Sequence, residues 1–285
     1  MPTIHQRVAA GRSRLRDAGL SPAEADISAR ALAEHLLGWS TERFLVDAVE
    51  TEPHDFAARF DAVVARRAAR EPLAYIVGVR EFWGLPFEVT PDVLIPRPET
   101  ELIVEATLGL YPDRDAPLAI ADACTGSGCL AVAIATERPR ATIVATDISA
   151  AALVVARRNA ERHDVADRVR FVATDLLSGI EGPFDLIVAN PPYVRDRDSR
   201  GLQPEVRNEP DVALFGGSEG LDTITRLLGD VPSRLHIGAH FICEFGFGQE
   251  IEVEQLFDRA AALAFLGFRR DLQGIARTAV ARRVA

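Results

Sequence analysis

The chain has 285 residues, of which 48% are hydrophobic and 26% charged, a composition typical of a globular protein with one or two domains. Its net charge of −10 disfavours a general nucleic-acid coat, because such a protein gains affinity by neutralising phosphates. No apolar run is long enough to span a bilayer and no charged-apolar-small leader opens the chain, so we expect a cytoplasmic protein.

The rarer residue types exclude further classes. All 32 basic residues are arginine, which rules out a lysine Schiff base and the lysine of a phosphate loop. The three cysteines form no C-x-x-C pair, so neither structural disulfides nor a zinc knuckle are expected. His236 and His240 share one face of a predicted strand without a third ligand, and we expect no metal site.

Residues 1–72 are predicted to form a small helical bundle. Ser21-Pro22-Ala23-Glu24 is a capping-box pattern with proline at the first helical position. The apolar residues that follow it at helical spacing are Ala29, Leu32, Ala33, Leu36 and Leu37. No catalytic constellation occurs here, which favours a purely structural bundle; its functional alternative is docking of a macromolecular substrate.

Residues 73–96 are predicted to form a β-hairpin linker. Glycine and proline punctuate two apolar segments, residues 75–78 and 81–89. The next run is Arg97-Pro98-Glu99-Thr100. Pro96 and Pro98 hold the backbone extended before a helix that begins near Glu99 or Thr100. Taken alone, this run is better explained as the start of a helix than as the lining of a ligand-binding site.

From residue 118 onward strands alternate with helices, which is typical of a doubly wound, mostly parallel α/β sheet. The predicted strands are residues 118–122, 142–146, 169–174, 184–189, 241–245 and 278–281. The predicted helices are residues 129–137, 150–163, 220–228 and 251–263. The basic tail that contains Arg277, Arg282 and Arg283 is interpreted as a solvated edge strand.

A glycine-containing loop, Cys124-Thr125-Gly126-Ser127-Gly128, joins the first of these strands to its helix. Its two glycines lack the Cβ atoms that would keep a ligand away from the backbone. Ala131 occupies the third position of the dinucleotide pattern, which the looser form admits, so a nicotinamide or flavin site stays open. The loop alone is equally well explained as a tight strand–helix turn.

Two acidic residues follow the next two strands. Asp147 lies about twenty residues after the glycines and can accept hydrogen bonds from both hydroxyls of a ribose. Alternatively, Asp147 or Ser149 caps the helix that begins at Ala150. Asp175 ends the third strand, where it could reach an adenine amino group or serve as a turn residue.

The fourth motif is Asn190-Pro191-Pro192-Tyr193, directly after a buried apolar strand. Two prolines cannot continue a strand ladder, so the chain leaves the sheet at Asn190. The asparagine offers an acceptor oxygen and an NH2 donor, and Tyr193 can stack on a planar –NH2 group. All four motifs fall at carboxyl ends of strands, where open α/β sheets bind ligands. The first two suit any adenosine cofactor, whereas the –NH2 clamp favours methyl transfer to nitrogen from S-adenosylmethionine over hydride transfer.

With these motifs the chain resembles the release-factor glutamine methyltransferases, the HemK or PrmC family. The resemblance covers nearly the whole chain, and its most specific parts are the linker and residues 97–101. It implies a helical substrate-recognition bundle over residues 1–72, a β-hairpin linker over 73–96 and an S-adenosylmethionine-dependent methyltransferase domain over 97–285.

The resemblance also assigns the site residue by residue. The cofactor contacts that it implies are Cys124, Thr125, Gly126, Ser127, Gly128, Asp147, Asp175, Leu176 and Asn190. The glutamine-binding residues that it implies are Asn190, Pro191, Pro192 and Tyr193, of which Asn190, Pro191 and Tyr193 take part in catalysis. The residues that it places at the border of the pocket are Arg97, Glu99 and Thr100. Cys124 stands where many members have glycine, and Leu176 where some place an aromatic residue beside the adenine.

The implied reaction is methyl transfer from S-adenosylmethionine to the side-chain amide nitrogen of a glutamine in peptide chain release factors. The alternative is N-methylation of a ribosomal-protein glutamine or of adenine in nucleic acid. A non-catalytic cofactor-binding module on the same fold is a third hypothesis. We expect a monomer that associates with no membrane and does not bind nucleic acid directly.

Overall fold

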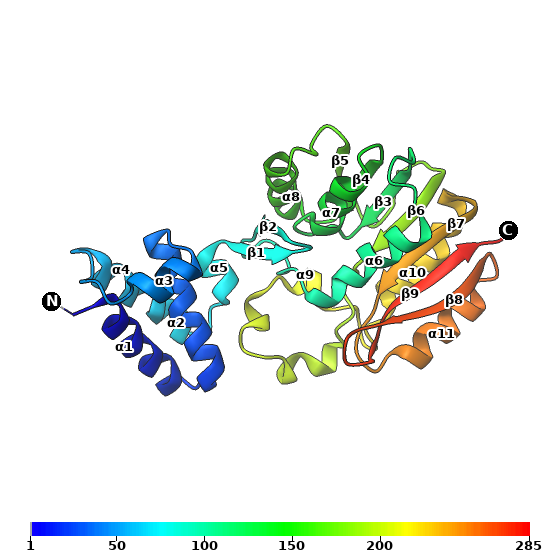
Figure 1. Ribbon diagram of the computed structural model, residues 1–285. Helices are drawn as coiled ribbons and strands as arrows, with labels where there is room; N and C mark the ends of the chain where they lie inside the picture. Colours follow the sequence, from blue (N-terminus) through cyan, green and yellow to red (C-terminus); the bar gives the residue numbers. More distant parts are fainter. Residues whose placement is uncertain (1) are drawn as a thin grey trace. The chain divides into compact units, whose positions relative to one another are not determined.

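The computed structural model describes residues 2–285, which fall into two compact units (Figure 1). The helical unit runs to Val79 and also contains Gln203–Asn208, whereas the sheet unit holds Arg80–Leu202 and Glu209–Ala285. Each unit has its own hydrophobic core, which consists of one cluster in the helical unit and two clusters in the sheet unit. None of the helices in the described residues is both long and apolar enough to cross a membrane.

Within its described residues the helical unit contains five α-helices, of which the first four lie where the sequence predicts a helical bundle. They are α1 (Ile4–Asp17), α2 (Pro22–Leu37), α3 (Thr41–Asp47), α4 (Phe56–Ala68) and α5 (Leu73–Val77). The predicted capping box is confirmed, because the Ser21 hydroxyl accepts from the Glu24 N–H while the Glu24 carboxylate accepts from the Ser21 N–H. Gly11 allows α1 to pack closely on α4, since a Cβ there would lie 2.6 Å from the Phe60 ring.

The prediction of a hairpin strand over residues 75–78 was wrong, because residues 75–77 lie in α5 and Gly78 follows as its C-cap. Tyr75 and Ile76 are buried, and a short apolar run does not by itself distinguish a helix from a strand. Gly78 ends the helix with a φ of +78°. The hairpin follows as β1 (Val79–Phe82) and β2 (Leu85–Glu88).

Ion pairs fix Gln203–Asn208 within the helical unit. The Arg67 guanidinium, 4% exposed, donates to the Glu205 carboxylate over 2.7 Å, and Arg70 donates to the same oxygen over 3.0 Å. The Asn208 side chain donates to the Arg70 carbonyl over 3.1 Å. Since a buried charge is costly without a partner, Glu205 compensates Arg67.

Residues 119–283 of the sheet unit contribute seven strands to one sheet. These are β3 (Ala119–Ala123), β4 (Thr142–Asp147), β5 (Val169–Ala173), β6 (Phe184–Ala189), β7 (Leu235–Glu244), β8 (Leu263–Arg270) and β9 (Ala276–Arg283). Their order is β5-β4-β3-β6-β7-β9-β8, and β9 alone runs antiparallel to both of its neighbours. The doubly wound, mostly parallel α/β fold predicted from the sequence is therefore confirmed.

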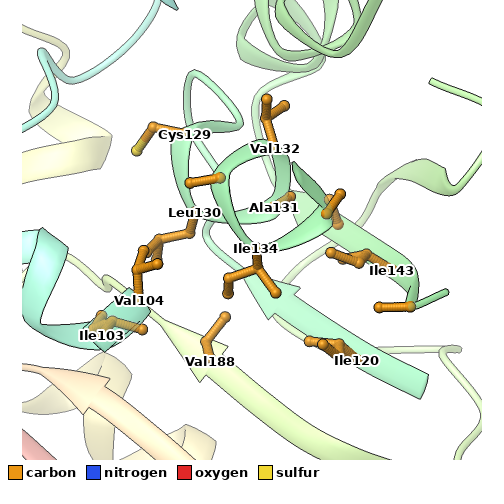
Figure 2. Close-up of a cluster of buried hydrophobic side chains, with 14 of the residues drawn as sticks. Ile103, Val104, Ile120, Cys129, Leu130, Ala131, Val132, Ile134, Ile143 and Val188 are labelled. Carbon is orange, nitrogen blue, oxygen red and sulfur yellow. The ribbon is translucent and has the colours of Figure 1, made fainter. Parts of the chain in front are cut away.

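Helices cover both faces of this sheet. They are α6 (Glu101–Leu110), α7 (Cys129–Glu137), α8 (Ala150–Arg162), α10 (Asp222–Asp230) and α11 (Glu250–Arg259), while the short α9 (Asp211–Leu214) lies in the loop after β6. Side chains alternate along a strand, so Ile120 packs in the core under α6 and α7 while Ala121 packs in the core under α10 and α11. Figure 2 shows the first of these cores, where Val104 of α6 and Ile134 of α7 converge on the strand residues Ile120 and Val188.

Two predictions for the C-terminal part were wrong. The helix expected over residues 251–263 ends at Arg259, and Leu263–Arg270 forms β8, which the sequence analysis missed. The basic tail forms β9, which lies between β7 and β8 and is not an edge strand. The alanine-rich stretch after Arg259 has high helix propensity, and pairing with β9 overrides that local preference.

We expect Glu205→Ala to lower the free energy of unfolding by about 3 kcal/mol, because Arg67 would keep a buried charge without its carboxylate. Urea denaturation of the full chain, followed by circular dichroism, measures the loss. Asp61→Ala removes the partner of the exposed Arg14 and is the matched control, with an expected loss below about 1 kcal/mol. Equal losses in the two variants would contradict the assigned role of Glu205.

Candidate active site

The carboxyl ends of four parallel strands lie side by side at one edge of the sheet. The register aligns Ala123 of β3 with Thr146 of β4 and with Ala189 of β6, and it aligns Ala189 with Cys243 of β7. A pocket, called the site pocket below, lies at this edge. The predicted site residues that line it are Thr100, Cys124, Thr125, Gly126, Ser127, Asp147, Asp175, Leu176, Asn190 and Pro192.

Five of the predicted site residues do not line the site pocket in the part of the chain that the structure describes. They are Arg97, Glu99, Gly128, Pro191 and Tyr193. Arg97 instead donates to Glu209 over 2.5 Å, and this buried carboxylate also accepts from the Ile95 N–H over 3.1 Å. Arg97 therefore helps to anchor the segment that leads to Thr100.

The glycine-containing loop is shaped by contacts on both sides. Gly128 has a φ of +80°, and a Cβ there would lie 3.0 Å from that of Ala156, so glycine allows α8 to pack closely. The buried Asn159 side chain donates to the Ser127 carbonyl over 2.9 Å. Cys124 adopts a φ of +62°, a left-handed conformation that favours glycine, and burial raises the pKa of its thiol.

Asp147 is held with both carboxylate oxygens oriented by the backbone. Oδ2 accepts from the Gly126 N–H over 2.9 Å, and Oδ1 accepts from the Ser149 N–H over 2.8 Å. Burial raises the pKa of Asp147, and these two backbone hydrogen bonds oppose that shift. Ser149 caps α8, because its hydroxyl accepts from the Ala152 N–H. Each Asp147 oxygen retains a lone pair for a further donor, which suits two vicinal hydroxyls.

The third acidic position is already paired. Asp175 accepts from Arg226 of α10 over 2.6 Å, and both side chains line the site pocket while remaining about half exposed to solvent. An exposed pair of this kind contributes at most about 1 kcal/mol, so a ligand amine can compete for the carboxylate. The neighbouring Leu176 is buried, with a φ of +51°.

The carboxamide of Asn190 has an asymmetric environment. Its Nδ2 donates to the Thr100 Oγ1 over 3.1 Å, whereas its Oδ1 has no hydrogen-bond partner among the described residues. The Tyr193 hydroxyl donates to Glu244 Oε1 over 2.9 Å. Asn190 Oδ1 is therefore a buried acceptor that no described residue satisfies.

Two glycines and one glutamine hold the backbone of the Asn190–Tyr193 turn. A Cβ on Gly216 would lie 2.4 Å from the Pro192 carbonyl oxygen. A Cβ on Gly220 would lie 2.2 Å from the Tyr193 carbonyl oxygen. Gln249 donates to the Tyr193 carbonyl over 3.0 Å and accepts from the Gly246 N–H over 2.8 Å. These contacts fix the backbone of the turn.

The sequence analysis missed several residues of the site. The additional lining residues include Val93, Leu94, Val212, Phe215 and Arg226, and the supporting residues are Gly216, Gly220, Glu244 and Gln249. The Gly216-Gly217 pair is a turn signal that could have drawn attention to this loop. Glu244 lay inside a predicted strand, so its position at the strand end was not apparent.

No metal-binding cluster is found at this site or elsewhere in residues 2–285, where no group of three or more histidine, cysteine or acidic side chains is arranged around a common point. His240 of β7 instead shares a hydrogen bond of 2.9 Å with the Tyr111 hydroxyl. Burial lowers the pKa of His240.

We expect Gly216→Ala to lower the free energy of unfolding by about 1–3 kcal/mol, because the new methyl group would overlap the Pro192 carbonyl. Gly229→Ala is the matched control: it lies in α10 with no atom near the added methyl group, and we expect it to stabilise the protein by up to about 1 kcal/mol. Chemical denaturation distinguishes the two. Equal stability of both variants would show that the turn tolerates displacement.

The chain was compared with known proteins. It matches the PrmC N-terminal domain family over residues 6–78 and the methyltransferase small domain family over residues 109–205. The release factor glutamine methyltransferase of Bradyrhizobium diazoefficiens is 41% identical over 275 residues, covering 95% of this chain and 92% of that protein. The corresponding protein of Bordetella pertussis is 43% identical over 267 residues, covering 92% and 97%.

A solved methyltransferase structure from Pyrococcus furiosus shares the fold, with a TM-score of 0.53 and 18% identity over 78% of this chain and 98% of that chain. The matches cover nearly the whole length of both release factor methyltransferases. The two family models match residues in both the helical and the sheet unit of this chain. The resemblance drawn from the sequence is thus confirmed, and the chain belongs to the release factor glutamine methyltransferase family.

Proposed function

We propose that this protein transfers a methyl group from S-adenosylmethionine to the side-chain amide nitrogen of a glutamine in peptide chain release factors. The observation that supports this most directly is the free Oδ1 of Asn190, at a residue that lines the site pocket together with the glycine-containing loop and Asp147. The names of the curated relatives support the choice of substrate.

The residues of the site pocket fit an adenosyl cofactor. Asp147 keeps two lone pairs for the ribose hydroxyls, and Gly126 has open space where a side chain would stand. Asp175 can accept from an adenine amino group once Arg226 yields part of its pairing. Leu176 contributes an apolar surface in place of an aromatic ring. When bound, S-adenosylmethionine supplies an activated methyl group on a sulfonium sulfur.

The chemical difficulty lies in the acceptor nitrogen. An amide nitrogen is a poor nucleophile because its lone pair is delocalised into the carbonyl group. We infer that Asn190 Oδ1 and the Pro191 carbonyl accept the two N–H bonds of the glutamine, which orients its lone pair and increases electron density on nitrogen. Tyr193 packs against the plane of the amide in this arrangement. Orientation and electrostatic stabilisation of this kind account for large parts of enzymatic rate enhancement.

The helical bundle of residues 1–72 is assigned to recognition of the protein substrate, with residues 73–96 as the linker and residues 97–285 as the catalytic domain. Supporting this, the short helix α3 and the residue that follows its C-cap expose three large apolar side chains, those of Leu45, Val46 and Val49, each more than two-thirds accessible. Leu45 and Val49 line the same surface hollow, and apolar side chains gathered in this way are typical of protein–protein contacts.

Parallel incubations test the substrate. The protein with labelled S-adenosylmethionine is given purified release factor, ribosomes or DNA, and we expect label only in release factor, on a glutamine side chain identified by mass spectrometry. A release factor with that glutamine replaced by alanine is the control and should stay unlabelled. Label confined to a ribosomal protein or to DNA would contradict the proposed substrate.

We expect Asn190→Ala to raise the activation barrier by about 2–4 kcal/mol, because one acceptor of the substrate N–H bonds is lost. Methyl-transfer kinetics at saturating cofactor measure kcat, and calorimetry with S-adenosylmethionine checks that the cofactor still binds. An undiminished kcat in this variant would remove Asn190 from the mechanism.

A further inference from the structure

The turn between β8 and β9 (Figure 1) lies at the edge of the sheet that carries the site pocket. β9 runs antiparallel to β7, so its first residues lie beside the carboxyl end of β7, where the Phe245 N–H donates to the Arg277 carbonyl over 2.9 Å. The turn spans residues 271–275 and contains Leu272, whose side chain is fully exposed to solvent. Leu272 is therefore presented at the same edge as the Asn190–Tyr193 turn.

One carboxylate holds the turn in a single conformation. Asp271 Oδ1 accepts from the backbone N–H groups of Gln273 and Ile275, each over 2.9 Å. Asp271 Oδ2 accepts from Arg277 Nε over 3.1 Å, and the Asp271 N–H donates to the Ile275 carbonyl over 2.8 Å. The backbone around Leu272 is thus ordered in advance, which lowers the entropy lost when a partner covers this side chain.

A second exposed apolar side chain, that of Phe247, is connected to this turn through Arg277. Phe247 is 71% exposed, and its ring centroid lies 5.9 Å from the guanidinium carbon of Arg277. This distance is within the range of a cation–π contact. The same guanidinium donates to Asp271, so the aromatic ring and the turn share one arginine.

A third exposed apolar side chain lies at the start of α11. Ile251 is 69% exposed and follows Glu250, which accepts from Arg270 over 2.5 Å. Arg270 also donates to the Gly274 carbonyl over 3.1 Å, so the start of α11 is tied to the turn. The three exposed apolar residues are called the rim residues below: Phe247, Ile251 and Leu272.

The loop that carries Phe247 also contacts the Asn190–Tyr193 turn. A Cβ on Gly246 would lie 3.1 Å from Tyr193 Cδ2, and Gln249 donates to the Tyr193 carbonyl over 3.0 Å. Phe247 lies one residue from the first contact and two residues from the second. The rim residues therefore continue the surface of the proposed catalytic turn.

The charges beside the rim residues are already compensated. Arg270 pairs with Glu250 over 2.5 Å, and Arg277 pairs with Asp271 over 3.1 Å. A surface that binds nucleic acid gains its affinity from cations that neutralise phosphates, and these two arginines are paired with carboxylates instead. Exposed apolar side chains between compensated charges fit a protein segment that carries apolar side chains of its own.

We propose that the rim residues dock the segment of the protein substrate that flanks the methylated glutamine. The proposal rests on the function proposed above, because it takes the glutamine amide to the Asn190–Tyr193 turn. A glutamine side chain reaches only about 5 Å beyond its Cα, and each extended residue beside it adds about 3.5 Å. The residues next to the glutamine therefore lie over the loop that contacts this turn.

The first test removes the apolar surface without touching the site pocket. We expect Leu272→Ser and Phe247→Ser each to raise the KM for release factor about 10-fold, because each removes apolar area that the substrate would cover. At saturating release factor, kcat should change by less than about twofold, and so should the S-adenosylmethionine affinity measured by calorimetry. A merely structural role would instead lower kcat and Tm, whereas substitutions of exposed side chains usually change stability little.

Two variants serve as controls for these measurements. Ile237→Ser removes an equally exposed apolar side chain, 73% accessible, near the opposite end of β7, and should retain the wild-type KM. Leu272→Met keeps an apolar side chain at the turn and should also retain it. An equal rise of KM in Ile237→Ser and Leu272→Ser would contradict a docking role of the rim.

A photo-crosslinker at position 272 identifies the partner directly. The full-length protein with p-benzoylphenylalanine in place of Leu272 is bound to release factor in the presence of S-adenosylhomocysteine, irradiated and analysed by mass spectrometry. We expect crosslinks to the segment within about five residues of the methylated glutamine, given a reach of about 3.5 Å per residue. Crosslinks only to a remote segment of release factor, or only to a second copy of this chain, would overturn the proposal.

The wild-type reaction separates this proposal from the function on which it rests. If the wild type does not methylate release factor, the proposed function falls and the docking role falls with it. If the wild type methylates release factor while Leu272→Ser and Phe247→Ser keep its KM, the proposed function stands and the docking role alone is wrong.

Discussion

The site depends on one backbone constraint, the departure of the chain from the sheet after Ala189. Pro191 and Pro192 provide no N–H for a ladder and restrict φ, so β6 cannot extend past this point. The strand lies between β3 and β7, and the register brings Cys124 to one side of Asn190 and Glu244 to the other. The order of the strands thus places the motif between the glycine-containing loop and a buried acid.

The turn itself is rigid because other segments fix its carbonyl groups. Gly216 and Gly220 approach it so closely that a methyl group would displace it, and Gln249 donates to the Tyr193 carbonyl. A preorganised turn loses little entropy when a substrate binds, which favours accurate placement of a weak nucleophile. The missing side chains at these glycines therefore matter as much for the geometry as the residues of the motif.

What could be predicted from the sequence was local. The parallel sheet, the glycine-containing loop, Asp147 and the proline turn each follow from a few consecutive residues, and the fold class and family were confirmed. The contact of Glu244 with Tyr193 was missed because it depends on strand register, and β8 was missed because its alanine-rich start resembles the end of a helix. Asp175 illustrates the intermediate case: its position at the pocket agrees with the sequence, whereas its pairing with Arg226 joins segments 51 residues apart.

Glu244 shows how the sheet places a costly group beside the turn. Its carboxylate is buried at the end of β7 and accepts from the Tyr193 hydroxyl over 2.9 Å. Burial makes the ionised form costly and raises the pKa of Glu244 to about 7. The turn is therefore held by a side-chain hydrogen bond at Tyr193 as well as by the contacts that fix its carbonyl groups.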